Sequence, residues 1–225
     1  IFKEHQKAGM KLFRRHLVFL RPSTIIVYDE LEADHEAEWT WLIHSPFEIK
    51  LNNKAGQFSA VSTKAKSNVT QFASGDLNIE LGTDFDPKPV NFRQMKGPDG
   101  KILEFANQWH IYSKSVQKAK IFRYLTFIQI KSIEDKTEFE KIITEKKTIK
   151  ISDWEFFAEL DVAKEASLSI INQKEKKALV YSLPELSLDG KNYRPKTKGS
   201  TFLIEILKDK SIIEEAVDEL PKGRD

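Results

Sequence analysis

Short runs of β-branched and aromatic residues, separated by Gly, Pro, Asn and Asp, recur along the whole chain. Leu12 to Leu20, Thr24 to Leu31 and Ala37 to His44 are three such runs near its start, joined by connections of only a few residues. Runs of this length are typical of β-strands, and short connections favour antiparallel neighbours. We therefore expect these three segments to form an antiparallel meander, with Glu32 to Glu36 as a polar turn.

Two features of these runs predict where the core lies. The stretch from Thr24 to Tyr28 is almost wholly apolar, which is typical of a strand buried on both faces. In the third run, strand alternation places Trp39 and Trp41 on one face. We interpret these two tryptophans as core residues.

The same pattern continues to the end of the chain. Further strand-like runs are Phe47–Leu51, Gln57–Ser62, Asn68–Ala73, Leu77–Gly82, Leu103–Tyr112, Lys120–Ile130, Ile149–Ile151, Trp154–Asp161, Ser167–Asn172, Lys177–Ser182 and Thr201–Leu207. A parallel sheet needs long crossover helices between strands, and the pattern lacks them. The predicted fold class is all-β, as a large antiparallel β-sandwich with little helix.

We expect residues 1–183 to form the sandwich, and residues 184–225 to form a C-terminal hairpin and charged tail packed on it. Two stretches leave the type of structure open. Ile133 to Lys147 is either a short helix or a charged excursion between strands, because apolar residues at helical spacing are surrounded by Glu and Lys. Ser211 to Leu220 is interpreted as a charged tail with helical character.

Composition narrows the class of protein. A chain of 225 residues with 15 Phe, 5 Tyr and 4 Trp buries a sizeable core. The 36 Lys and Arg nearly balance the 34 Asp and Glu, which argues against a nucleic-acid partner. No apolar run approaches the roughly 20 residues of a membrane span. The absence of Cys excludes disulfides, and the absence of an initial Met suggests a piece of a longer protein.

Candidate chemistry is sparse. The histidines stand too far apart in sequence for a recognisable metal site, and we see no nucleophile elbow or phosphate loop. We therefore expect no catalytic residue, metal or other cofactor in this chain. The candidates for substrate contact are His44 and His110, each either a structural or a ligand-facing histidine, and Trp109, which has polar neighbours and could stack on a sugar.

An ordered set of residues nevertheless resembles a known family. Arg15 to Pro22, Ile25 to Leu31 and Glu38 to His44 are similar to the first strands of the sandwich domain of heparinase II/III-like polysaccharide lyases. Gln108-Trp109-His110, followed by Arg123 to Thr126, resembles later strands of that domain. The resemblance covers about the first 130 residues.

The resemblance implies a bacterial periplasmic or extracellular protein that acts on an acidic polysaccharide by β-elimination. In that family a base removes a proton beside a uronate carboxylate, and a helical toroid domain precedes the sandwich. The family's catalytic and zinc-binding motifs have no counterpart in this chain, so we assign none of its residues to those roles. The alternatives are a stand-alone carbohydrate-binding module and a purely structural β-sandwich.

Overall fold

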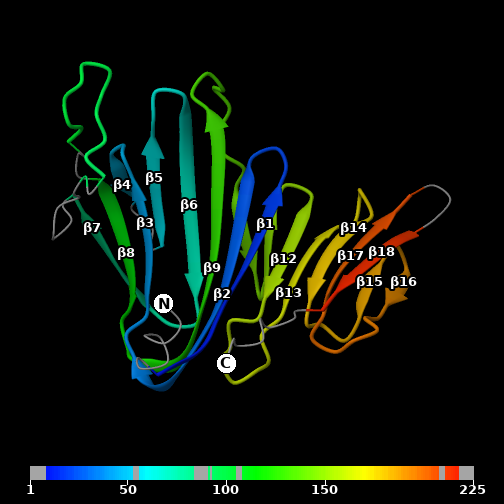
Figure 1. Ribbon diagram of the computed structural model, residues 1–225. Coiled ribbons are helices and arrows are strands. Elements are labelled where there is room, and N and C mark those ends of the chain that lie inside the picture. Colours follow the sequence, from blue (N-terminus) through cyan, green and yellow to red (C-terminus); the bar gives the residue numbers. More distant parts are fainter. Residues whose placement is uncertain are drawn as a thin grey trace. The chain divides into compact units, whose positions relative to one another are not determined.

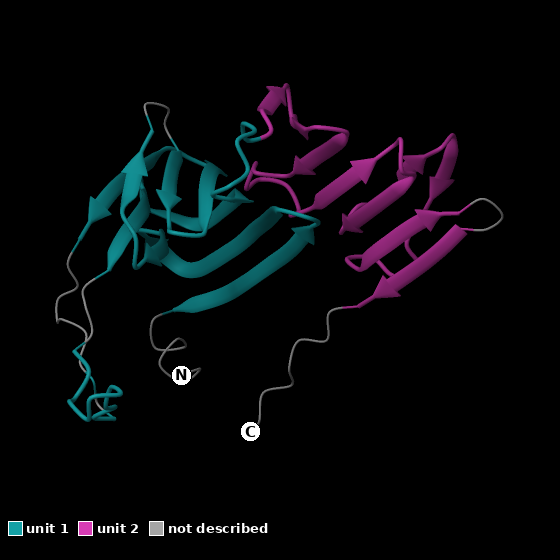
Figure 2. Cartoon of the chain, turned by 90° about the horizontal axis from the view of Figure 1, so that it is seen from above, with its two compact units in different colours: residues 1–139 teal, residues 140–225 magenta. Residues whose placement is uncertain are grey.

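The computed structural model describes residues 9–52, 56–83, 91, 93–104, 108–207 and 211–217. All of the regular structure in these residues is strand, and every strand pair is antiparallel. The predicted all-β, antiparallel fold class is confirmed. The chain divides into two compact units, Ile1–Phe139 and Glu140–Asp225 (Figure 2).

Unit 1 contains two sheets (Figure 1). The larger has the strand order β1-β2-β9-β6-β5-β4 and the smaller the order β3-β8-β7. The strands are β1 (Met10–Leu20), β2 (Thr24–Ala37), β3 (Thr40–Ser45), β4 (Ile49–Leu51), β5 (Gln57–Val61), β6 (Ala65–Ala73), β7 (Leu77–Gly82), β8 (Trp109–Ser115) and β9 (Ala119–Ser132).

The two sheets of unit 1 enclose a hydrophobic core. Leu31 on β2 and Phe122 on β9 are cross-strand partners in the larger sheet, and both belong to this core. Trp39, Trp41 and Ile111 meet them from the side of the smaller sheet. The predicted core position of both tryptophans is confirmed.

β2 and β9 are buried on both faces. On the face opposite the core described above, Tyr28 on β2 and Phe127 on β9 are fully buried. Because successive side chains of a strand point to opposite faces, a strand covered on both sides needs apolar residues at consecutive positions. Burial on both faces therefore explains the apolar run from Thr24 to Tyr28, and the sequence-based prediction for this strand is confirmed.

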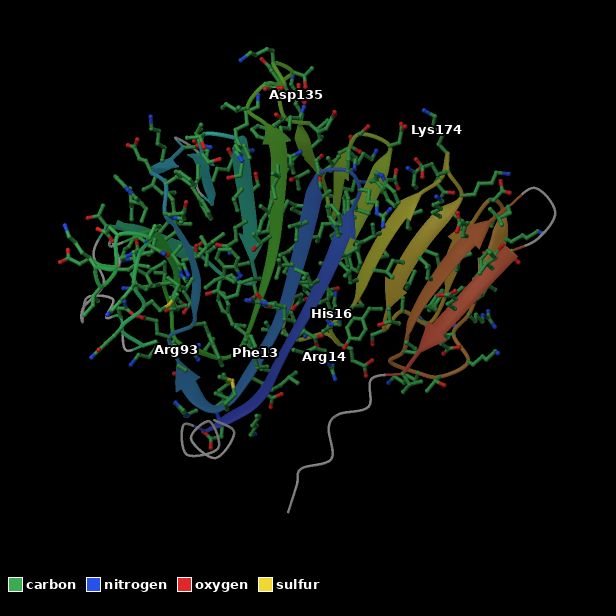
Figure 3. All side chains as sticks on the ribbon, turned by 45° about the horizontal axis from the view of Figure 1, so that its top comes forward. Phe13, Arg14, His16, Arg93, Asp135 and Lys174 are labelled. Atoms are coloured by element: carbon green, nitrogen blue, oxygen red, sulfur yellow. The ribbon has the colours of Figure 1, made fainter. Side chains whose placement is uncertain are left out.

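Two consecutive carboxylates interrupt that apolar run, and β1 supplies a cation for each. Asp29 is 1% exposed and accepts two hydrogen bonds from Arg15, at 2.6 and 2.9 Å. Glu30, on the other face, lies 2.8 Å from Nε2 of His16 and 3.9 Å from Arg14. The bond to Asp29 raises the pKa of Arg15. Figure 3 labels Arg14 and His16 on β1.

This charge pairing specifies how β1 aligns with β2. In the observed register Arg15 is opposite Asp29. A slip of two residues would keep the faces of β1 but place Asp29 opposite Phe13 or Leu17, with its buried charge unpaired. A slip of one residue would exchange the two faces of β1. Hence the ion pair of Arg15 with Asp29 favours the observed alignment.

Unit 2 contains a seven-stranded sheet, of order β10-β11-β12-β13-β14-β17-β18, and a separate hairpin, β15-β16. The strands are β10 (Ile142–Glu145), β11 (Thr148–Ile151), β12 (Trp154–Ala158), β13 (Leu168–Asn172), β14 (Lys177–Tyr181), β15 (Leu186–Leu188), β16 (Lys191–Tyr193), β17 (Thr201–Ile206) and β18 (Ser211–Ala216). The hairpin packs on the sheet through Leu186 and Leu188, which join Val180, Phe202 and Ile204 in a second core.

One carboxylate of unit 2 holds the loop between β16 and β17. Glu215 on β18 accepts hydrogen bonds from the backbone N–H groups of Lys196 and Thr197, at 3.0 and 2.8 Å. It also accepts one from the hydroxyl of Ser200, at 2.7 Å. These bonds, with that of Ser200 the largest contributor, lower the pKa of Glu215.

Several local expectations from the sequence were wrong. Glu32 to Glu36 is no turn but the continuation of β2, which runs to Ala37. β3 pairs with β8 rather than with β2, so the third strand of the expected meander lies in another sheet. Ser211–Ala216 is strand rather than helix, because it pairs along β17.

The segment from Ile133 to Lys147 contains no helix. Residues 133–141 have no regular structure, and Ile142–Glu145 and Thr148–Ile151 form a hairpin, as the excursion interpretation of Ile133 to Lys147 requires. The expected boundary between residues 183 and 184 does not coincide with the division between Phe139 and Glu140. β17 and β18 extend the sheet that β10 to β14 begin.

Removing the cation that pairs with the buried Asp29 should destabilise the protein. We expect Arg15→Ala to lower the free energy of unfolding by about 2 kcal/mol at neutral pH, because Asp29 would keep a buried charge without its partner. Urea denaturation measures this. Lys11→Ala, which removes the exposed pair with Glu32, is the control and should change stability by less than about 0.5 kcal/mol.

The loop held by Glu215 should respond to acid. Because folding lowers the pKa of Glu215, its stabilising contribution is fully present above the ordinary glutamate pKa of about 4.3 and disappears as the pH falls through the lower folded value. We expect the amide NMR signals of Lys196 and Thr197 to shift together over that lower range. A transition at or above the ordinary glutamate value would contradict the assignment. Glu215→Gln should abolish the transition.

Candidate functional site

The outer face of the smaller sheet of unit 1 brings two of the sequence-predicted site residues together. His44 on β3 is the direct cross-strand partner of His110 on β8, which in turn faces Gly82 on β7. Side chains at directly opposed positions of antiparallel strands have Cβ atoms about 5 Å apart. His44 is exposed, whereas only 2% of His110 is exposed.

His110 is held on three sides. Its Nδ1 lies 3.2 Å from the carbonyl oxygen of Gln108, and its ring meets that of Tyr112 edge to face, with centroids 4.7 Å apart. A Cβ atom at Gly82 would overlap the imidazole of His110. Glycine therefore leaves the space that this ring occupies.

The next rows of the same face supply an aromatic ring and charge. Tyr112 lies opposite Leu42 on one side and Glu80 on the other. The ammonium of Lys114 lies 5.6 Å from the centroid of the Tyr112 ring and 2.7 Å from a carboxylate oxygen of Glu80. The hydrogen bond that Lys114 donates to Glu80 raises the pKa of Lys114.

This arrangement is suited to binding. It combines an aromatic ring and an exposed aliphatic side chain, Leu42, with imidazole, phenol, ammonium and carboxylate groups. Sugars are bound by such faces, where apolar surface meets their C–H groups and polar groups bond their hydroxyls. Among the residues that the structure describes, no group of three or more His, Cys, Asp or Glu could hold a metal ion.

Trp109 takes a different place from His44 and His110. It is half-buried and packs against the core of unit 1, next to Ile111 on the inner face of β8. Strand alternation thus separates it from its neighbour His110. This packing favours the structural interpretation of Trp109 and leaves the two histidines as the residues of the outer face.

Sequence reasoning missed Tyr112, Lys114 and Glu80. The first two follow His110 at intervals of two residues along one strand, and this spacing is the signal that could have found them. Glu80 could not be found in this way, because its position beside Lys114 depends on the pairing of β7 with β8.

The residues that carry the family resemblance contact one another. Arg15 bonds Asp29, which is opposite Tyr124 on β9. The hydroxyl of the buried Tyr124 lies 2.9 Å from the carbonyl oxygen of Trp39, and burial raises the pKa of Tyr124. Glu30 is opposite Arg123. Through Arg15, Asp29 and Tyr124, strands β1, β2 and β9 are thus connected to Trp39, the residue before β3.

Comparisons with known proteins add no assignment. No protein-family model matches the chain, and no curated protein matches it. Within the described ranges, none of the secondary structure is a helix with the length and apolar character needed to cross a membrane.

The space at Gly82 gives a prediction for the candidate site. We expect Gly82→Ala to displace the imidazole of His110 and to lower the free energy of unfolding by about 1–3 kcal/mol, the usual cost of overpacking. Imidazole NMR signals and urea denaturation measure the two effects. Gly75→Ala is the matched control, because a Cβ there makes an ordinary 3.4 Å contact with Phe122. Equal effects of both substitutions would contradict the assignment.

Proposed function

We propose that this chain is the β-sandwich portion of a heparinase II/III-like polysaccharide lyase that acts on acidic glycans by β-elimination. In this proposal the catalytic groups come from other parts of the protein, among them an upstream helical toroid domain. The outer face of β3, β8 and β7 contacts the glycan. A bacterial periplasmic or extracellular location belongs to the same proposal.

The observation that carries the proposal is the pairing of His44 with His110. The two histidines end separate segments of the family resemblance, 66 positions apart in sequence, and they are direct cross-strand partners on one sheet face, where His44 is exposed and His110 is buried. Neighbouring side chains on that face combine apolar surface with hydrogen-bonding groups. A role restricted to the core would not need an exposed imidazole at position 44.

A second observation supports the family assignment. The ordered Arg, Asp, Trp and Arg-Tyr residues of the resemblance form one network of contacts, through Arg15, Asp29, Tyr124 and Trp39. Apolar strands resemble one another by chance, but a buried ion pair adjoining a buried phenol has more specific requirements. The packing of Trp109 in the core favours the alternative of a structural sandwich, so binding must be measured.

Binding through the outer face can be tested with a uronate-containing hexasaccharide. We expect calorimetric titration to detect binding, and Tyr112→Ala to weaken it about three- to tenfold, the usual contribution of an aromatic contact. His44→Ala should also weaken it. Phe13→Ala, which removes an exposed aromatic ring on β1, is the matched control and should leave affinity unchanged.

The same samples separate the proposed lyase portion from its alternatives. These residues alone should release no unsaturated uronate product, which absorbs in the ultraviolet, and turnover by them would contradict the proposal. Unchanged binding in both Tyr112→Ala and His44→Ala would overturn the role of this face. Absence of any binding would favour the structural sandwich.

A further inference from the structure

A pocket in unit 2 opens where the hairpin β15-β16 ceases to cover the large sheet. The hairpin packs over β14 and β17, and the edge strand β18 continues the same face beyond it. Between the end of β16 and β18 lies a cavity of about 470 Å³. This volume falls within the range of ligand pockets in proteins, roughly 300–1,000 Å³.

The pocket has an apolar floor and side. Phe202 on β17 is 2% exposed and lines the pocket, next to Ile213 on β18 and Val217 just beyond it. Ile213 and Val217 are 53% and 55% exposed. Apolar side chains left this open beside a cavity provide a surface for an apolar face of a ligand.

The opposite rim is positively charged. Residues 190–200 contain Lys191, Arg194, Lys196 and Lys198 and no acidic residue. Arg194 pairs with Glu185 at 2.7 Å, and Lys198 with Glu165 at 2.9 Å. Lys196 lines the pocket, and its ammonium makes no ion pair with a residue in the described part of the chain.

Glu215, the one acidic residue among the described residues that line the pocket, already accepts hydrogen bonds. Both carboxylate oxygens of Glu215 accept hydrogen bonds from the loop that carries Lys196. Glu215 therefore holds the basic loop in place, and the donors offset part of its charge. Tyr193, at the start of this loop, adds an aromatic ring to the lining.

We propose that this pocket binds a uronate residue of an acidic glycan, with the carboxylate at Lys196 and Arg194 and the C–H face of the sugar against Tyr193, Ile213 and Val217. The choice of a glycan rests on the proposed function. Five of the nine lining residues are charged or hydroxylated, which suits a sugar ring with hydroxyls along its edge. An acidic peptide with an apolar side chain is the competing ligand.

The pocket adds a site for the carboxylate group to the proposed glycan-binding surface. On the outer face of unit 1, Glu80 offsets the charge of Lys114, so that face offers hydrogen bonds more than positive potential. Among the described residues of unit 2, Lys196 has no carboxylate at ion-pair distance, although Glu215 attracts it at longer range, so its ammonium can contact a ligand carboxylate. In this proposal the pocket of unit 2 binds the carboxylate of the glycan, and the outer face of unit 1 binds its hydroxyls.

The test uses the whole chain, a uronate-containing hexasaccharide and its carboxyl-reduced counterpart. Heteronuclear NMR titration should shift the amides of Thr197 and Ile213 with the acidic form only. Arg194→Gln combined with Lys196→Gln should weaken this binding about fivefold and remove those shifts, as expected for two partly exposed charge contacts. Added salt should weaken the binding as well.

Lys174→Gln is the matched control, because Lys174 is an exposed cation of the same unit, labelled in Figure 3 and paired with Asp153. It should leave the titration unchanged. Shifts confined to residues of unit 1, equal binding of the carboxyl-reduced form, or a preference for an acidic peptide would overturn the pocket assignment and leave the proposed function standing. Lack of binding anywhere would refute both. Pocket shifts that persist while Tyr112→Ala and His44→Ala leave the affinity unchanged would refute only the outer face.

Discussion

The structure of unit 1 depends on one constraint, which is that β2 and β9 are buried on both faces. A strand in that position cannot leave a charge unpaired, yet β2 carries Asp29 and Glu30 at consecutive positions. Because consecutive side chains point to opposite faces, each carboxylate needs its own cation. The edge strand β1 provides them, through Arg15 on one face and Arg14 on the other, where the imidazole of His16 also lies 2.8 Å from Glu30. An edge strand thus supplies charge compensation to the middle of the sheet.

The same constraint connects the core to the candidate site. Tyr124 is opposite Asp29, and its hydroxyl reaches the carbonyl oxygen of Trp39, just before β3 begins. This bond anchors the chain to the larger sheet directly before β3. Five residues later the strand presents His44 on its outer face, where β8 presents His110. The ion pair of Arg15 with Asp29 and the two histidines of the outer face are thus linked through β2, β9 and β3.

The sequence predicted those features that depend on local pattern. The apolar run from Thr24, the core position of Trp39 and Trp41, and the all-β class follow from alternation and composition alone. Strand partnership does not. β3 pairs with β8 across a separation of more than 60 residues, and the tail strand β18 is ordered by β17. Long-range pairing of this kind determines which faces meet.

The candidate site shows the same division. Sequence reasoning reached His44 and His110 as separate residues, and their position opposite one another required the pairing of β3 with β8. It preferred Trp109 to its neighbours because polar residues flank it, whereas alternation within β8 turns that side chain toward the core. Lys196 was not considered, because the pocket beside it is formed by a loop, a hairpin and a sheet edge together.

The incomplete cover over the sheet of unit 2 has a consequence for its motions. The hairpin β15-β16 buries the face of β14 and β17, whereas β18 has a neighbouring strand on one side only and exposes Ile213. Local openings begin where few apolar contacts must be broken. Amide hydrogens of β18 should consequently exchange with solvent sooner than those of β14. Local stability in this unit therefore decreases from the middle strands of the sheet to its edge strand.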